Sequence, residues 1–185
     1  SGPFRGITVC RNGKNIPYTE EGRKLKIHEK PGATGEYRHE IRLGKRATEA
    51  SFLVVLELVS LTRRRLHFIA EHQQCRDQKS HLYGAYLIYD NEEKRQYYGH
   101  RNDINGGRER VGMGILFAYY LQHCPDARLQ ESLDQYAAYV LRELYDEETG
   151  EVFNDAPRCN DYTRLYNAPW IGRFFLEMYL LTKEP

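Results

Sequence analysis

The chain lacks an apolar run of about 18 residues, the length that a membrane-crossing helix needs. Its most apolar stretch, 52–61, is interrupted by Glu57 and followed by the arginines 63–65. A membrane span is therefore not expected. The 185 residues suffice for one well-buried core, or for one core with a small appendage.

An excess of positive charge is also missing. The 27 Lys and Arg side chains nearly balance the 26 Asp and Glu side chains, which leaves a formal net charge of +1. The arginines 63–65 form the densest basic cluster, but three consecutive residues of a helix point in different directions rather than forming a stripe. Proteins that bind duplexes carry a concentrated basic face, so no nucleic-acid partner is expected.

Paired cysteines of the CxxC type are absent, which argues against a zinc ribbon or a thioredoxin-like motif. The four cysteines are widely spaced, and free thiols are favoured, with one or two disulfides as the alternative: Cys10, Cys75, Cys124 and Cys159. His100 and His123 form no metal-ligand pattern with the acidic residues. Neither a metal nor another cofactor is therefore expected.

The first quarter of the chain, 1–45, predicts a β-rich segment and part of a companion domain. Short alternating segments at 6–9 and 24–28, and a third at 36–43, indicate strands. The pair Asn12-Gly13 is a strong signal for a hairpin turn.

The remainder, 46–185, predicts a domain of antiparallel helical hairpins, so the fold class expected is mainly α. Apolar residues recur at three- and four-residue intervals in four segments, which predict helices at 47–75, 107–124, 127–145 and 169–182. Asp126 is placed to cap the third helix. Pro169 falls in the first turn of the fourth, where proline is favoured.

Two polar loops precede the second and fourth helices, at 100–107 and 154–168. If both helices run antiparallel to the third, their N-termini share one end of the bundle and the two loops lie side by side. Asp103 and Asp161 are the preferred acid/base candidates, with Glu109 and Asp155 in reserve. Each acid could instead stabilise a helix N-terminus.

Three segments resemble parts of the six-hairpin glycosidase-like proteins, the (α/α) toroids. The segments 106–118 (GGRERVGMGILFA) and 166–182 (YNAPWIGRFFLEMYLLT) are similar to the entries of inner helices in that superfamily. The segment 145–153 (YDEETGEVF) resembles an outer helix followed by a short extended turn. The resemblance covers roughly residues 80–185 and implies an incomplete toroid.

The resemblance implies a carbohydrate-active protein that acts on a polysaccharide or oligosaccharide, with its site where the inner helices begin. A glycoside hydrolase working through two carboxyl groups is the main hypothesis. Binding of the sugar is expected from six further side chains: His100, Arg108, Tyr162, Tyr166, Asn167 and Trp170.

The alternatives to a hydrolase are a polysaccharide lyase, or a non-catalytic scaffold that binds glycans or proteins. A lyase needs a base beside a uronate and a cation that neutralises the uronate carboxylate. The expected partners are a carbohydrate substrate and further domains or subunits that complete the toroid. A periplasmic or secreted location is favoured over a cytoplasmic one.

Overall fold

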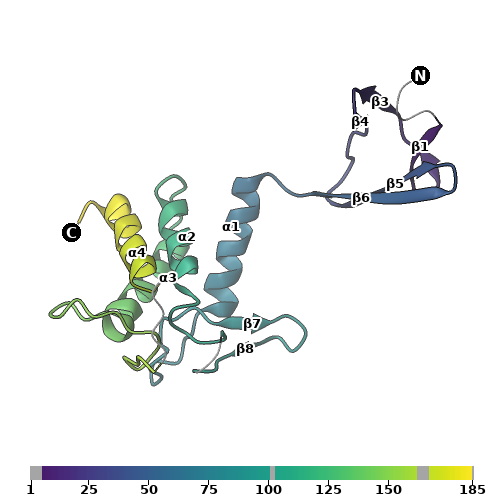
Figure 1. Cartoon of the computed structure of the whole chain (residues 1–185). Coiled ribbons are helices and arrows are strands. Elements are labelled where there is room, and N and C mark those ends of the chain that lie inside the picture. Colours follow the sequence, from purple (N-terminus) through teal and green to yellow (C-terminus); the bar gives the residue numbers. More distant parts are fainter. Residues whose placement is uncertain (1–5, 101–102, 162–166, 185) are drawn as a thin grey trace. The chain divides into compact units, whose positions relative to one another are not determined.

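The computed structural model describes residues 6–100, 103–161 and 167–184. The chain divides into two compact units, Ser1–Leu61 and Thr62–Pro185 (Figure 1). All four cysteines belong to the described residues and are free thiols. No helix among the described residues is long and apolar enough to span a membrane.

The first unit is built from antiparallel strands. One sheet has the order β2-β1-β5-β6, and a separate hairpin pairs β3 with β4. The strands are β1 (Ile7–Arg11), β2 (Lys14–Asn15), β3 (Tyr18–Glu21), β4 (Lys24–Ile27), β5 (Gly35–Leu43) and β6 (Arg46–Val54). Asn12 and Gly13, with φ of 50° and 74°, form the predicted turn between β1 and β2.

The helix expected from residue 47 is wrong over its first part, because Arg46–Val54 is the strand β6. It pairs with β5 along its whole length, from Leu43 opposite Arg46 to Gly35 opposite Val54. Gly44, with φ of 58°, makes the tight turn that brings the two strands together. Pairing with β5 therefore overrides the helical spacing of the apolar residues in this segment.

The second unit contains the helices and one short hairpin. Its elements are α1 (Leu58–Phe68, of which the first residues precede the unit boundary), the π-helical turn η1 (Ile69–Gln73), β7 (Ile88–Asp90), β8 (Arg95–Tyr97), α2 (Val111–Leu121), α3 (Ala127–Tyr139), the π-helical turn η2 (Val140–Leu144) and α4 (Asn167–Thr182). The helices predicted at 107–124, 127–145 and 169–182 are thus confirmed with shifted ends. Asp126 caps α3 as predicted, since its side chain accepts from the N–H groups of Arg128 and Leu129.

The core of the second unit lies between these helices and the segment that follows η1. Tyr86 is fully buried there, with its ring stacked on Tyr136 at 4.4 Å and on Phe117 at 5.0 Å between centroids. Leu133 of α3 and Phe174 of α4 are also fully buried. The side chains of α2, α3 and α4 therefore meet in one apolar cluster.

The mainly α fold class and the toroid resemblance are both wrong. The described residues form four α-helices and eight strands in three sheets. These helices form no ring of hairpins (Figure 1). The helix entries were identified and residues 1–45 were expected to be β-rich, but the strands continue to Val54 and the β7–β8 hairpin interrupts the region expected to be helical.

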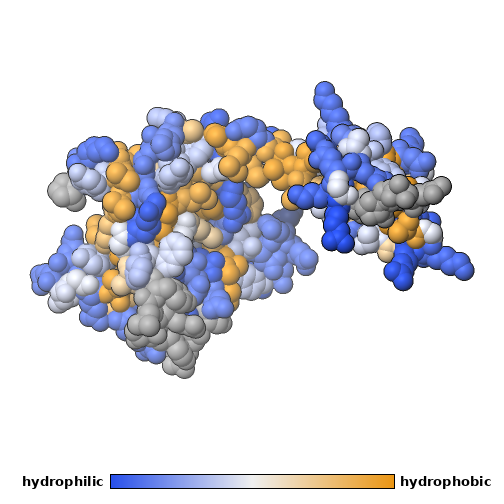
Figure 2. All heavy atoms as spheres, turned by 45° about the horizontal axis from the view of Figure 1, so that its top comes forward, coloured by the Kyte–Doolittle hydropathy of each residue, from blue (hydrophilic) through white to orange (hydrophobic). Residues whose placement is uncertain are grey.

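One face of α4 is exposed, although apolar residues occur around most of the helix. Ile171 and Phe174 are buried, whereas four large apolar side chains are exposed: Trp170, Leu176, Tyr179 and Leu180. Apolar atoms are visible at the surface of the helical unit (Figure 2).

Candidate functional site

The two predicted polar loops lie side by side, as their helix directions implied. The N–H of Arg108 donates to the carbonyl of Asn154 at 2.9 Å, and the N–H of Gly106 donates to Asp155 Oδ1 at 3.1 Å. Gly107 permits this approach, because a Cβ there would lie 2.2 Å from the Asn154 carbonyl oxygen. The loops are thus joined backbone to backbone.

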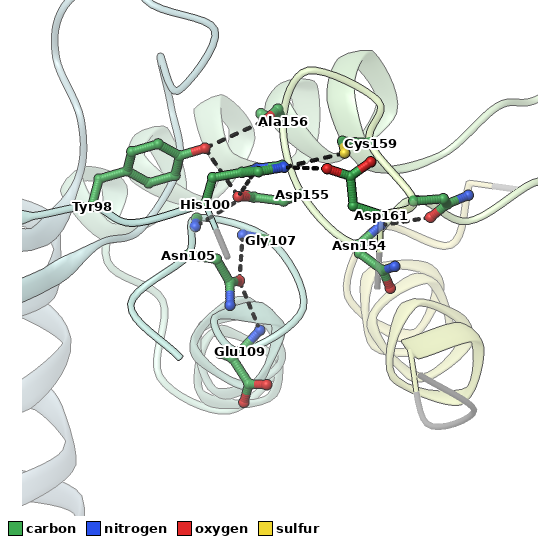
Figure 3. A network of polar contacts seen from close by, with 12 residues as sticks. Tyr98, His100, Asn105, Gly107, Glu109, Asn154, Asp155, Ala156, Cys159 and Asp161 are labelled. Carbon is green, nitrogen blue, oxygen red and sulfur yellow. Dashed lines mark hydrogen bonds and ion pairs between the residues drawn. The ribbon is translucent and has the colours of Figure 1, made fainter. Parts of the chain in front are cut away.

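Asp155 is a buried carboxylate at the junction of the loops, with 1% of its surface exposed. Besides Gly106, it binds the hydroxyl of Tyr98 at 3.0 Å and Nδ1 of His100 at 3.0 Å (Figure 3). Burial raises the pKa of Asp155, while the hydrogen bonds from Tyr98 and His100 act in the opposite direction. Because three donors occupy its oxygens, Asp155 is placed to orient its neighbours rather than to face a substrate.

His100 presents its second nitrogen away from Asp155. Since a carboxylate accepts hydrogen bonds, we assign the proton on the neutral ring to Nδ1, which leaves the lone pair on Nε2. Nε2 lies 3.2 Å from Cys159 Sγ and 3.5 Å from Asp161 Oδ2. The His100 side chain is 30% exposed and that of Asp161 is 52% exposed, so this side of the ring is accessible from solvent.

A tight reversal of the chain brings the partners of His100 together. The N–H of Cys159 donates to the carbonyl of Asp155 at 2.8 Å, and the N–H of Asn154 donates to the carbonyl of Cys159 at 2.9 Å. The side-chain oxygen of Asn160 also accepts from the N–H of Asn154, at 3.0 Å. One short loop therefore supplies both the carboxylate on Nδ1 and the two groups on Nε2.

Tyr98 completes this arrangement from the segment after β8. Its hydroxyl donates to Asp155 and lies 3.3 Å from the carbonyl of Ala156. The side chain remains 40% exposed. Burial, and then the charge of Asp155, raise the pKa of Tyr98, so the phenol keeps its proton. We call the five residues Tyr98, His100, Asp155, Cys159 and Asp161 the His100 centre.

The other predicted acids lie on the first loop. Asp103 is exposed in a turn, where its carbonyl accepts a hydrogen bond from the Arg110 guanidinium. Glu109 is half-buried and pairs with Nε of the buried Arg108 at 3.4 Å. The roles predicted for these residues stay predictions.

The predicted sugar-binding residues on α4 differ in how deeply they are buried. Asn167 is buried at the start of the helix, where its amide donates to the side-chain oxygen of Asn154. Trp170 is 45% exposed on α4. Tyr162 and Tyr166 lie outside the described residues.

Two members of the His100 centre were missed as site residues. Cys159 belongs to the second polar loop and Tyr98 lies just before the first, but phenol and thiol groups are common in cores. Cys159 lies 59 residues from His100 along the chain, so no local spacing connects them. The available signal was the alternation of Cys159 and Asp161, which places both side chains on the same side of an extended segment.

No known family profile and no curated protein matches the chain. A solved structure, Polysaccharide Lyase BACCELL_00875, is similar to it with a TM-score of 0.85 and 30% sequence identity. The likeness covers 100% of this chain but 28% of that one. The chain thus spans little more than a quarter of its structural neighbour. This likeness supports the carbohydrate-related part of the expectation, and it supports the lyase alternative better than the hydrolase hypothesis.

Proposed function

We propose that this chain is part of a polysaccharide lyase that cleaves uronate-containing chains by β-elimination at the His100 centre. The likeness to a polysaccharide lyase along the whole chain supports the class of reaction. The observation that carries the site is the buried Asp155, which holds His100 with Nε2 toward solvent. This lyase proposal replaces the two-carboxylate hydrolase as the preferred function.

The surroundings of Asp155 argue against hydrolysis by a carboxylate pair. An acid and a base or nucleophile must both face the glycosidic bond. Asp155 is occupied by donors from Tyr98, His100 and Gly106, whereas Asp161 is exposed. A centre with one oriented imidazole and one exposed phenol fits proton transfer next to a carboxylate better.

β-Elimination removes the proton from the carbon that bears the uronate carboxylate and breaks the bond to the neighbouring sugar oxygen. The carboxylate must be neutralised so that charge can develop on it, and the departing oxygen must receive a proton. We place the substrate carboxylate beside Nε2 of His100, where a cation must offset its charge and that of Asp161. We assign both proton transfers to Tyr98, a residue that is 40% exposed: its hydroxyl gives its proton to the departing oxygen, and its oxygen takes up the proton from the carbon that bears the carboxylate.

The test is to incubate the chain with a panel of uronate-containing polysaccharides and to follow two products. Elimination produces new reducing ends together with the ultraviolet absorbance of an unsaturated uronate, whereas hydrolysis produces reducing ends alone. We expect both signals. Reducing ends without absorbance, or no cleavage of any member of the panel, would contradict the proposal.

A matched pair of variants tests whether Tyr98 takes part in the reaction. Tyr98→Phe removes the hydroxyl and should lower the rate of elimination by roughly 10²–10⁴-fold. Tyr179→Phe removes a hydroxyl from the exposed face of α4 and should leave the rate unchanged. Equal rates for the two variants would exclude Tyr98 from the reaction.

A further inference from the structure

We propose that His100, Cys159 and Asp161 bind a zinc ion. One ligand atom from each residue belongs to a group whose members all lie within 4.8 Å of one another. Nε2 of His100 is 3.2 Å from Sγ of Cys159 and 3.5 Å from Oδ2 of Asp161 (Figure 3). The ligands come from two loops that are locked together by backbone hydrogen bonds.

Two of the three ligand spacings fit tetrahedral zinc, and the third, between Cys159 Sγ and an Asp161 oxygen, is at most 4.8 Å. Zn–N, Zn–O and Zn–S bonds of ordinary length place ligand atoms about 3.4 Å apart for a nitrogen–oxygen pair and about 3.6 Å apart for a nitrogen–sulfur pair. The His100–Asp161 and His100–Cys159 distances differ from these values by a few tenths of an ångström. Imidazole, thiolate and carboxylate are the ligand types that zinc binds. A hard cation such as Mg²⁺ or Ca²⁺ prefers oxygen ligands alone.

The outer contacts of the cluster also match a metal site. A histidine that binds zinc through one nitrogen usually donates its other N–H to a carboxylate or carbonyl, which fixes the ring and strengthens the ligand. Asp155 has that place on Nδ1 of His100, and it is held in turn by Tyr98 and Gly106. The lone pair of Nε2 therefore points toward Cys159 and Asp161.

A bound zinc ion would explain why a thiol and a carboxylate both lie close to Nε2 of His100. With the ring proton on Nδ1, Nε2 offers a lone pair, and the Asp161 carboxylate that approaches it also offers only lone pairs. One divalent cation would bind the lone pairs of all three residues at once. The competing explanation is a plain thiol–imidazole hydrogen bond, which leaves Asp161 as an exposed surface carboxylate.

Three protein ligands leave one tetrahedral position open, as in zinc sites that act on substrates. The exposure of His100 and Asp161 places that position toward solvent. We assign it to the uronate carboxylate, whose charge the zinc would neutralise, and this role rests on the proposed lyase function. Zinc binding itself does not depend on that function.

The first test is calorimetric titration of the metal-free chain with Zn²⁺. We expect uptake of one ion per chain, and strong weakening in Cys159→Ser and Asp161→Asn. The matched controls are Cys124→Ser and His123→Gln, which change the same residue types outside the cluster and should bind zinc as the parent chain does. No uptake by the parent chain, or parent-like affinity in Cys159→Ser, would overturn the proposal.

Cobalt provides a signature that a structural role for Cys159 would not produce. Co²⁺ in the site should show a thiolate-to-metal absorption band that Cys159→Ser abolishes and Cys124→Ser retains. Asp155→Asn should keep the band while affinity falls by about 10–100-fold, because Asp155 orients His100 without touching the metal. If Cys159→Ser fails to fold, Cys159→Asp keeps an anionic ligand and should bind the metal without the band. The band surviving in the Cys159 variant would exclude this thiolate as a ligand.

The elimination assay separates the two proposals. Cleavage that a chelator abolishes and Zn²⁺ restores is the expected result. Cleavage by a chain that takes up no zinc would overturn the metal site and leave the lyase proposal intact. Zinc uptake without cleavage of any polysaccharide would overturn the lyase proposal alone, and full activity of the chelator-treated chain would overturn the carboxylate-binding role of the metal.

Discussion

Gly107 determines how closely the two loops of the His100 centre approach. A Cβ at this position would lie 2.2 Å from the Asn154 carbonyl oxygen and 2.8 Å from Cα of Asp155, and both obstacles are backbone atoms. Gly107→Ala should therefore force the loops apart and lower the free energy of unfolding by about 1–3 kcal/mol. Urea denaturation measures this change.

Gly112 provides the matched control. It lies in α2, where a Cβ would meet nothing within 4 Å. Gly112→Ala should stabilise the chain by about 0.5–1 kcal/mol, because alanine loses less backbone entropy in a helix. A Gly107→Ala variant as stable as the parent chain would show that the loops separate at no cost.

Residues of the His100 centre could be predicted from the sequence where their position in one of the two polar loops was enough to identify them. Asp155, Asp161 and His100 followed from the expectation that two loops meet at one end of the helices. Their surroundings did not follow, because burial of Asp155 depends on Tyr98 and Gly106, which approach from another part of the chain. A carboxylate expected to face substrate is instead buried and hydrogen-bonded.

At the scale of elements, the start of α3 depends on Asp126. Its Oδ1 accepts from the N–H groups of Arg128 at 3.2 Å and Leu129 at 3.3 Å, and its Oδ2 lies 3.0 Å from His67 Nε2. Asp126→Ala removes the cap and should cost about 1 kcal/mol, with 2 kcal/mol as an upper value. Asp126→Asn keeps a capping oxygen and should lose less, as judged by urea denaturation.

Asp126 should also make the stability of the chain depend on pH in the acid range. Burial alone would raise the pKa of Asp126, but the Leu129 N–H and His67 outweigh it, so the pKa falls below its ordinary value of 3.8. The unfolded chain then binds the proton more readily, so the stabilisation is complete above 3.8 and is lost as the pH falls through the folded pKa. The stability difference between the parent chain and Asp126→Asn should shrink in this acid range. A difference that stays constant with pH would contradict this assignment.

Helices were easier to predict than strands for a physical reason. A helix buries a stripe that recurs within its own sequence, as Leu129, Leu133 and Tyr136 do in α3. The strand β6 depends on its pairing with β5 across the Gly44 turn, and most of its side chains are exposed. Its few apolar residues therefore carried no clear two-residue alternation, and the segment resembled the start of a helix.

At the scale of the whole molecule, the fold class was misjudged by extending local likeness. The sequences at 106–118 and 166–182 do lead into the helices α2 and α4. Nothing local to such a helix entry reports how many hairpins follow, or that six strands form a unit of their own. The number and arrangement of elements depend on contacts between distant segments, which periodicity does not record.

The sole tryptophan allows the stability of the second unit to be measured within the full chain. Trp170 lies on α4, next to the buried Ile171, so its fluorescence reports unfolding of the helices that pack with α4. Leu133→Ala removes a fully buried side chain from α3 and should lower the free energy of unfolding by about 2–5 kcal/mol in this signal. Leu176→Ala shortens a side chain that is about half exposed on α4, and should change this free energy by no more than about 0.5 kcal/mol. Equal shifts in the two variants would mean that the apolar face of α4 is covered in solution.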